Sequence, residues 1–350
     1  MPGESGLSER EDQILQAVVQ CYITTAEAVG SRTIVKRFSL DLSPATVRNV
    51  MADLEEAGYL QQLHTSSGRV PTDQGYRYYV DHLMQVQQLT LAERARIERE
   101  LSGQLEDADE ALRQTSQLLA LVAHQAGIVE APDKAAAEVR YIEVIPVVTS
   151  RAAVLIADNH GRVHTVMVPV EEALQEAELT RLNNFLNEHL RGVTFDDLAA
   201  LMHESMRSHL HEERRLAEQA LHLLNLMPVG RRGQLYLEGT TALFEQPEFR
   251  DVDKAREVFG VLEERDRLVE LLRGRMTGRG QGVPQVLIGS ESQEPGLKEI
   301  SVVASPYRVG SETVGVLGVL GPRRMPYGRL TSIVDYTAGM LSRLLTRLAG

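Results

Sequence analysis

The chain contains one cysteine, Cys21, and no tryptophan, and aromatic residues make up only 5% of its 350 positions. A single cysteine excludes an intrachain disulfide and any zinc site that is built from several cysteines. We expect Cys21 to be a buried packing residue, with a redox switch as the alternative. Stability must therefore come from hydrophobic cores, and a 43% hydrophobic content is enough for two or three domains.

Long apolar runs are also missing from the sequence. No stretch approaches the ~18 consecutive apolar residues that are needed to span a bilayer. The first residues, MPGESGLSERED, are polar and acidic and do not resemble a signal peptide. We therefore expect a cytoplasmic protein with no membrane partner.

An excess of positive charge is absent as well. The chain has 37 Lys+Arg against 49 Asp+Glu, which gives a formal net charge of -12. This balance excludes a protein that binds nucleic acid through general attraction to phosphate. Most cations of the first 82 residues nevertheless lie between Arg32 and Arg77. DNA binding by this region would make few phosphate contacts and would depend on base edges and dimer symmetry.

The most informative stretch runs from Leu42 to Tyr79. Ser43 is a suitable N-cap and Pro44 follows at the first helical position, so the sequence predicts a helix that begins there. An apolar stripe at helical spacing predicts the buried face of this helix, and Gly58 predicts its end. The opposite face is small and polar near its start, and it carries Arg48 and Asn49, which can hydrogen-bond guanine and adenine. The stripe consists of Val47, Val50, Met51, Leu54 and Ala57.

Flanking segments complete a known DNA-binding pattern. Residues 59–64 predict a strand, residues 65–68 a turn and residues 69–71 the return strand, with Arg69 near the tip. Upstream, Ser8 opens a capping box before a first helix, and Ser31 is expected to cap a short second helix. Three short helices followed by a hairpin predict a winged helix-turn-helix, whose third helix enters the major groove. The alternative is an αα-hairpin in an unrelated small domain.

The rest of the chain alternates between helical and strand patterns. Residues 91–129 predict a long charged helix that either packs on its own domain or forms a coiled coil. Residues 171–282 are mostly helical, with one strand at 233–239, and Leu at helical spacing makes this block a plausible association surface. Strands are expected on both sides of this block, at 139–147, 152–158, 162–169, 284–292, 300–309 and 313–322, before a helix at 329–348. If these strands form one sheet, the helical block between them is an insertion.

Three enzyme-like patterns fail on inspection. His203-Glu204 starts like a zinc-protease motif, but Arg207 stands where the second histidine is required. The glycines Gly315, Gly318 and Gly321 lie in and just after an apolar strand rather than in a strand-to-helix turn. Residues 278–282 lack the Lys-Ser/Thr of a phosphate-binding loop. We expect no enzyme activity, no cofactor and no metal site.

Four segments carry a resemblance to a known family: VGSRTIVKRF, LSPATVRNVMADLEEAGYLQQLHTSSGRVPTDQGYRYYVD, YLEGTTALFEQPEF and TVGVLGVLGPRRMPYGRL. With them the chain resembles the bacterial heat-inducible transcription repressor family, HrcA. The resemblance implies an α+β multidomain fold with a winged helix-turn-helix at 1–84. It also implies a GAF-like α/β domain at 85–170 and 283–350, interrupted by a mainly helical dimerisation domain at 171–282.

The same resemblance implies a function. It points to repression of chaperone operons in the heat-shock stress response, by a homodimer on an inverted-repeat DNA operator called CIRCE. Heat stress would release the DNA, and the GroEL chaperonin would restore activity. The DNA-binding residues that match the family pattern are Ser31, Arg32, Thr33, Lys36, Thr46, Arg48, Asn49, Ser66, Ser67, Gly68 and Arg69.

Two other functions remain open at this stage. A metabolite-sensing repressor would use the GAF-like domain as a ligand pocket. A chaperone-associated protein-interaction module would use the winged helix to hold protein instead of DNA.

Overall fold

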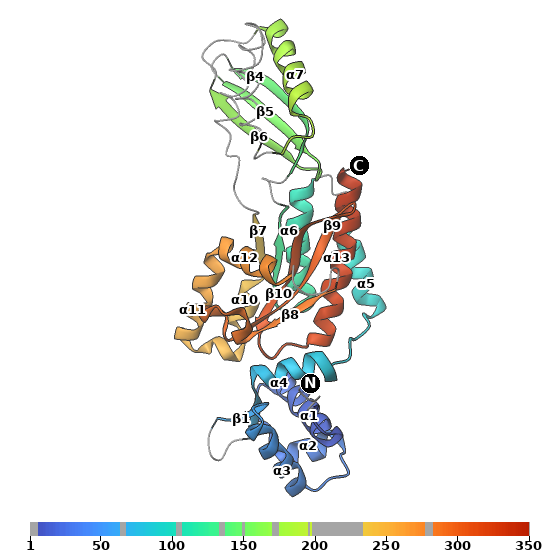
Figure 1. Ribbon diagram of the computed structural model, residues 1–350, viewed down its shortest axis with the longest axis vertical. Coiled ribbons are helices and arrows are strands. Elements are labelled where there is room, and N and C mark those ends of the chain that lie inside the picture. The colour runs from blue at the N-terminus through green and yellow to red at the C-terminus, as the bar shows by residue number, and fades with distance from the viewer. Residues whose placement is uncertain are drawn as a thin grey trace, which may run out of the picture.

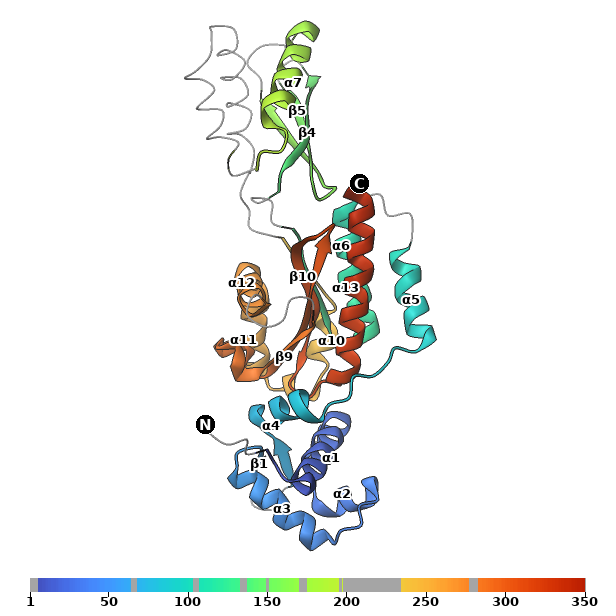
Figure 2. The ribbon, with the colours of Figure 1, turned by 45° about the vertical axis from the view of Figure 1, so that its right-hand side comes forward.

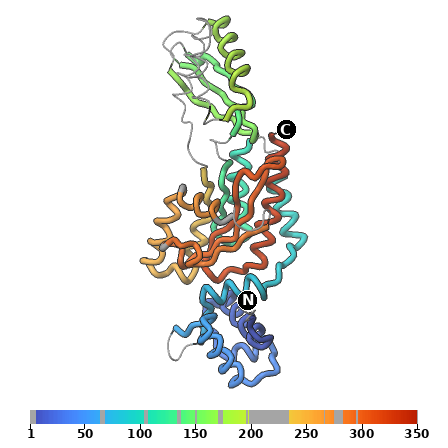
Figure 3. The backbone as a smooth tube through the Cα atoms, in the orientation of Figure 1, coloured from blue at the N-terminus to red at the C-terminus, as the bar shows by residue number. Residues whose placement is uncertain are grey.

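The computed structural model is elongated, with three units that follow one another along its long axis (Figure 1, Figure 3). We call them the N-terminal unit, with helices α1 to α4 and the hairpin β1–β2; the central unit, built on a five-stranded sheet; and the distal unit, built on a three-stranded sheet. The structure describes residues 6–63, 68–102, 107–132, 137–148, 151–169, 175–194, 197, 234–276 and 283–349.

The N-terminal unit follows the expected order of elements. It contains α1 (Glu9–Thr25), α2 (Ser31–Phe38), α3 (Pro44–Glu56) and the antiparallel strands β1 (Leu60–Gln62) and β2 (Arg69–Pro71). The apolar stripe predicted for α3 is buried in one hydrophobic core with residues of α1 and α2, apart from Ala57, which is exposed. Burial of this stripe fixes which face of α3 remains outside.

The helix caps were predicted correctly at two of three positions. Ser8 forms a capping box with Glu11, and the Ser43 side chain accepts the backbone N–H of Thr46 at the start of α3. Gly58, with φ of 83°, follows α3 in the left-handed region that favours glycine. The prediction for Ser31 was wrong, because Gly30 is the N-cap of α2 and makes no side-chain cap.

A connection then leads from the N-terminal unit into the central unit. Helix α4 (Asp73–Tyr78) continues into a π-helical turn, Tyr79–Leu83, and α5 (Leu91–Leu101) and α6 (Ala108–Ala123) follow. The prediction of one helix over 91–129 was wrong in two ways. The segment forms two helices, since Ser102 is the C-cap of α5 and Asp107 is the N-cap of α6, and its last residues are not helical. His124 ends α6 in the left-handed region, and Ala126–Glu130 form strand β3 because they pair with β10 and β7. Tertiary pairing overrides the local helical pattern here.

The central sheet is antiparallel throughout, in the order β7-β3-β10-β9-β8. Helices α6 and α13 (Tyr327–Ala349) cover one face, while α11 (Val252–Glu263) and α12 (Arg265–Met276) cover the other (Figure 2). Each face has its own buried hydrophobic cluster. The remaining elements are strands β7 (Leu235–Glu238), β8 (Gln285–Ile288), β9 (Ile300–Val309) and β10 (Glu312–Pro322), helix α10 (Thr240–Phe244) and three short 3-10 turns, Pro247–Arg250, Gly289–Ser292 and Pro295–Leu297.

The distal unit differs from the expected grouping of strands. Strands β4 (Val139–Val148), β5 (Arg151–Asp158) and β6 (Val163–Pro169) were expected to share a domain with the C-terminal strands. Instead they form a separate sheet, and α7 (Glu176–Leu190) buries one of its faces. Conversely, β7, which was expected within the insertion, pairs with β3 in the central sheet. Alternation of polar and apolar residues predicts a strand but not its partner.

The contact between β3 and α6 leads to a stability prediction. A Cβ added at Gly127 would lie 2.1 Å from the Ser116 carbonyl oxygen and 2.8 Å from the Ala120 amide nitrogen, both backbone atoms. We expect Gly127→Ala to lower the free energy of unfolding by roughly 1–3 kcal/mol, because the helix must move away from the strand. Urea denaturation measures this loss.

The matched control is Gly260→Ala in α11, where nothing lies within 4 Å of the added Cβ. The same substitution there should raise stability by up to about 1 kcal/mol, through helix propensity alone. Equal effects at the two positions would contradict close packing at Gly127.

Candidate nucleic-acid interface

Helix α3 lies at the end of the N-terminal unit that is far from the central unit (Figure 1, Figure 2). Arg48 and Asn49 are exposed on it, whereas their neighbours Val47 and Val50 are buried. In the described part of the chain, Arg48 makes no ion pair that would compete for its guanidinium group. The two side chains with the best chemistry for base edges are therefore free on the outer face.

Helix α2 contributes a second set of candidates. Arg32, Thr33 and Lys36 are exposed, and Lys36 lies in the last turn of the helix with Arg37. Ser31 differs from them because it is only 8% exposed. The structure therefore brings Arg32, Thr33 and Lys36 to the surface but leaves Ser31 in the interior.

Thr46 has a structural partner within the first turn of α3. Its hydroxyl lies 2.9 Å from the hydroxyl of Ser43, which also accepts the backbone N–H of Thr46 at 3.1 Å. The residue is half-buried. Thr46 thus supports the start of the helix that presents Arg48.

Arg69 follows the hairpin turn as expected, opposite Gln62, and it has a partner that the sequence did not predict. Its Nε and Nη2 lie 2.9 and 2.7 Å from Glu55 Oε2 in the later part of α3. Its backbone also exchanges two hydrogen bonds of 2.9 Å with Val29. Arg69 therefore ties the hairpin to α3. A phosphate group would have to compete with Glu55 for it.

Val29 was missed by the sequence reasoning, although it forms a bridge that adds to the hairpin. The signal that points to it is Gly68, where an added Cβ would lie 2.4 Å from the Val29 carbonyl carbon and oxygen. Only glycine permits this close approach of two backbones. Gly68 is thus explained by packing, while Ser66 and Ser67 lie outside the described residues.

Charge is distributed unevenly along α3. No acidic residue occurs in its first turn, whereas Asp53, Glu55 and Glu56 lie toward its end. Negative charge along α3 therefore lies away from Arg48 and Asn49, and part of it is neutralised by the pairing of Glu55 with Arg69. Only the opening turns of α3 are thus suited to approach a polyanion.

The described residues contain no group of three or more His, Cys, Asp or Glu side chains that could hold a metal ion. Within the same ranges, no helix combines the length and the apolar character that crossing a bilayer requires.

Comparison with known proteins adds the family. Residues 109–331 match the family model described as HrcA protein C terminal domain. The heat-inducible transcription repressor HrcA of Geobacter sulfurreducens is 42% identical over 97% of this chain and 98% of its own length. The repressor of the same name from Pelotomaculum thermopropionicum is 37% identical, covering 98% of both chains. A crystal structure of a hypothetical protein is similar in fold, with a TM-score of 0.68, 23% identity and coverage of 98% of this chain and 100% of the other.

These matches first define a class, the transcription repressors that respond to heat. Within that class the chain belongs to the HrcA family, because the family model covers more than half of it and relatives above 30% identity cover nearly all of it. The family resemblance noted in the sequence is thereby confirmed. The relatives are named as regulators and not as enzymes.

The exposed positions of Arg48 and Lys36 lead to contrasting predictions. Arg48→Ala should weaken operator binding by about 1–3 kcal/mol and relax specificity at one base position. Lys36→Ala should weaken binding to all sequences similarly and reduce the salt slope by about one. Gel-shift titrations with an operator and its single-base variants, at several salt concentrations, measure both effects. Identical behaviour of the two variants would contradict this division of roles.

The Arg69–Glu55 pair gives a further prediction. Glu55→Gln removes the carboxylate that holds Arg69, so binding to unrelated duplex DNA should strengthen and its salt slope should steepen by about one. Glu56→Gln is the matched control, since it removes the same charge from an exposed neighbour. If both variants strengthen binding equally, release of Arg69 is not the cause.

Proposed function

We propose that the chain represses chaperone operons by binding, as a homodimer, to an inverted-repeat operator of the CIRCE type. The observation that carries the proposal is the free outer face of α3, with Arg48 and Asn49 exposed at one end of the molecule. In this reading the N-terminal unit is a winged helix-turn-helix, α3 is the recognition helix and β1–β2 is the wing. The DNA-contacting side chains are then Arg32, Thr33, Lys36, Arg48 and Asn49, with Ser66 and Ser67 of the turn predicted from sequence as further contacts.

We infer a domain division that follows the sheets. The N-terminal unit corresponds to the proposed winged helix at 1–84. The central unit, with residues 85–132 and 234–349, corresponds to the proposed GAF-like domain, since its antiparallel sheet carries helices on both faces. The distal unit would then belong to the inserted dimerisation domain, whose limits move to about residue 137 and about residue 233 because β4, β5 and β6 leave the central sheet.

The distal unit offers a surface that suits self-association. On the face of its sheet away from α7, cross-strand partners place Tyr141 beside Ala157 and Val163, and Ile145 beside Ala153 and Met167. Tyr141 is 50% exposed, Val163 61% and Met167 45%. The row formed by Glu143, Leu155 and Thr165 lies between these two rows. Exposed apolar side chains gathered on one face of a sheet are typical of a binding surface. We assign this face to the dimer contact.

Dimerisation would supply most of the affinity. With so few cations around α3, one N-terminal unit should bind duplex DNA weakly. Tethering a second one adds an effective-concentration gain of roughly 10²–10⁴-fold when both half-sites can be reached at once. Heat that separates or misaligns the dimer would therefore release DNA, and refolding of the repressor by the GroEL chaperonin would restore binding.

The test compares a full inverted repeat with a single half-site in gel-shift titrations. The wild-type chain should bind the full repeat at least about a hundredfold more tightly than the half-site. Val163→Glu should shift the chain to a monomer in light scattering, because it places a charge in the apolar face, and should reduce full-repeat affinity to the half-site level.

Thr180→Glu on the exposed surface of α7 is the matched control, since it adds the same charge to the same unit. Equal affinity of the wild-type chain for repeat and half-site would contradict the dimeric repressor. A monomeric Val163→Glu chain that keeps full-repeat affinity would contradict it as well.

A further inference from the structure

Four segments that lie far apart in the sequence meet where the N-terminal unit joins the central unit. They are α4, the 3-10 turns Pro247–Arg250 and Gly289–Ser292, and the chain that links β10 to α13. None of them lies on the outer face of α3. We call this place the joint. It comprises Asp73, Arg77, Gln246, Glu248, Ser290, Glu291, Arg323 and Arg324 with the side chains packed beneath them.

Asp73, the first residue of α4, accepts three hydrogen bonds from the central unit. Ser290 donates its backbone N–H at 2.9 Å and its hydroxyl at 2.6 Å, and Arg323 Nη1 donates at 2.9 Å. Burial alone would raise the pKa of Asp73, but the bonds from Ser290 and the charge of Arg323 outweigh it and hold the pKa below its ordinary value. The carboxylate thus stays charged and engaged near neutral pH.

Gly289 shows how closely α4 approaches this loop. Its φ is +47°, in the region that favours glycine, and an added Cβ would lie 2.7 Å from Asp73 Oδ2 and 2.8 Å from the Lys298 carbonyl oxygen. The loop therefore needs a residue without a side chain for Ser290 to reach the carboxylate.

Arg77, one turn further along α4, makes a two-pronged contact with the same loop. Its Nε and Nη2 donate to the two carboxylate oxygens of Glu291 at 2.7 and 2.5 Å, and Nη2 also donates to the Val286 carbonyl at 2.6 Å. Such paired bonds fix direction as well as distance. Asp73 and Arg77 together prevent α4 from rotating about its own axis.

The adjacent arginines of the β10–α13 link reach two helices of the N-terminal unit, α4 and α1. Arg323 bridges Asp73 and Glu299, each at 2.9 Å. Arg324 is held by Glu248 and by Gln246 Oε1 at 2.8 Å, and its Nη1 donates to the Ile23 carbonyl in α1 at 3.4 Å. One short stretch of chain therefore contacts α4 and α1 at the same time.

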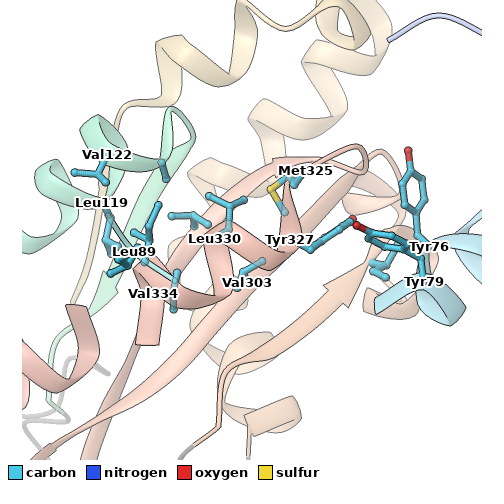
Figure 4. Close-up of a cluster of buried hydrophobic side chains, with 14 of the residues drawn as sticks. Tyr76, Tyr79, Leu89, Leu119, Val122, Val303, Met325, Tyr327, Leu330 and Val334 are labelled. Atoms are coloured by element: carbon cyan, nitrogen blue, oxygen red, sulfur yellow. The ribbon is translucent and has the colours of Figure 1, made fainter. Parts of the chain in front are cut away.

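An apolar layer lies beneath these charges. Tyr76 and Tyr79 from the N-terminal unit and Met325 and Tyr327 from the central unit are buried in one cluster (Figure 4). The rings of Tyr76 and Tyr327 meet edge to face, with centroids 6.1 Å apart. Hydrophobic contact holds the two units together but sets no direction. The charged groups around it supply that direction.

We propose that Asp73, Arg77, Arg323 and Arg324 are positioning residues for operator recognition: they fix the angle of α3 relative to the central unit and thereby the separation of the two recognition helices. The proposal rests on the dimeric repressor proposed above. An N-terminal unit that can rotate relative to the central unit still binds one half-site. In the dimer, however, the separation of the two α3 helices no longer matches the spacing of the half-sites, so the second half-site is no longer reached at high effective concentration.

The experiment uses the full chain and three duplexes: the inverted-repeat operator, the same repeat with its spacer changed by half a helical turn, and a half-site. Arg323→Gln and Asp73→Asn should each weaken binding to the native spacing by about tenfold and leave half-site affinity unchanged. Their preference for native over altered spacing should shrink. A merely structural role would lower all three affinities together.

Arg267→Gln is the matched control, since Arg267 pairs with Glu264 and Glu294 inside the central unit. It should keep the wild-type spacing preference. If Arg323→Gln also keeps the wild-type spacing preference, the joint does not position the N-terminal unit and the proposal is overturned.

A second measurement is independent of DNA. Spin labels at Gln61→Cys in the hairpin and Leu121→Cys in α6 occupy exposed positions on either side of the joint, while Cys21 is buried. Labelled chain diluted in unlabelled chain should give a narrow distance distribution, and Arg323→Gln should broaden it relative to Arg267→Gln. An unchanged width overturns the proposal. If the wild-type chain shows no preference for the full repeat while Arg323→Gln still broadens the distribution, the proposed function fails and the joint stands.

Discussion

The contact of α4 with the loop Gly289–Ser292 and with Arg323 is the constraint on which the long molecule depends. It is the place where the buried hydrophobic cluster runs without a break from the helices of the N-terminal unit into α6 and α13. Ion pairs surround this cluster and are partly shielded from water, so they restrict orientation as well as separation. Without this contact, only the connecting chain would link the N-terminal unit to the central sheet, and their relative orientation would not be fixed.

The candidate interface is the face of α3 that the hydrophobic core leaves exposed. Because Val47, Val50, Met51 and Leu54 are buried, the opposite side of α3 must face outward. Arg48 and Asn49 are exposed for that reason. The hairpin is then tied to the far end of the same helix by the Arg69–Glu55 pair, so helix and hairpin form one rigid surface. A chain with a net charge of -12 can thereby offer a local surface that suits DNA.

Local signals predicted most of the N-terminal unit. Ser8, Ser43 and Gly58 act within one helical turn of themselves, and their effects were predicted correctly from sequence. Ser31 was wrongly predicted as the N-cap of α2, because the helix begins one residue earlier than expected and Gly30 is the N-cap. Arg69 does begin the return strand next to the turn, as predicted, but its ion pair with Glu55 was not foreseen because Glu55 lies in another element. The family was recognised from four segments of the sequence. That two of these segments meet α4 at the joint could not be predicted from the spacing of residues.

The sequence by itself determined where α1 and α3 begin, which face of α3 is apolar and to which family the chain belongs. These properties depend on residue type and on separations of a few positions along the chain. Tertiary structure decided which strands share a sheet, so that β7 joined the central sheet while β4, β5 and β6 left it. It also decided the partners of Arg69, Arg77 and Arg323. Pairings between residues that are tens or hundreds of positions apart produce no periodic pattern in the sequence, because they are set by the packing of whole elements.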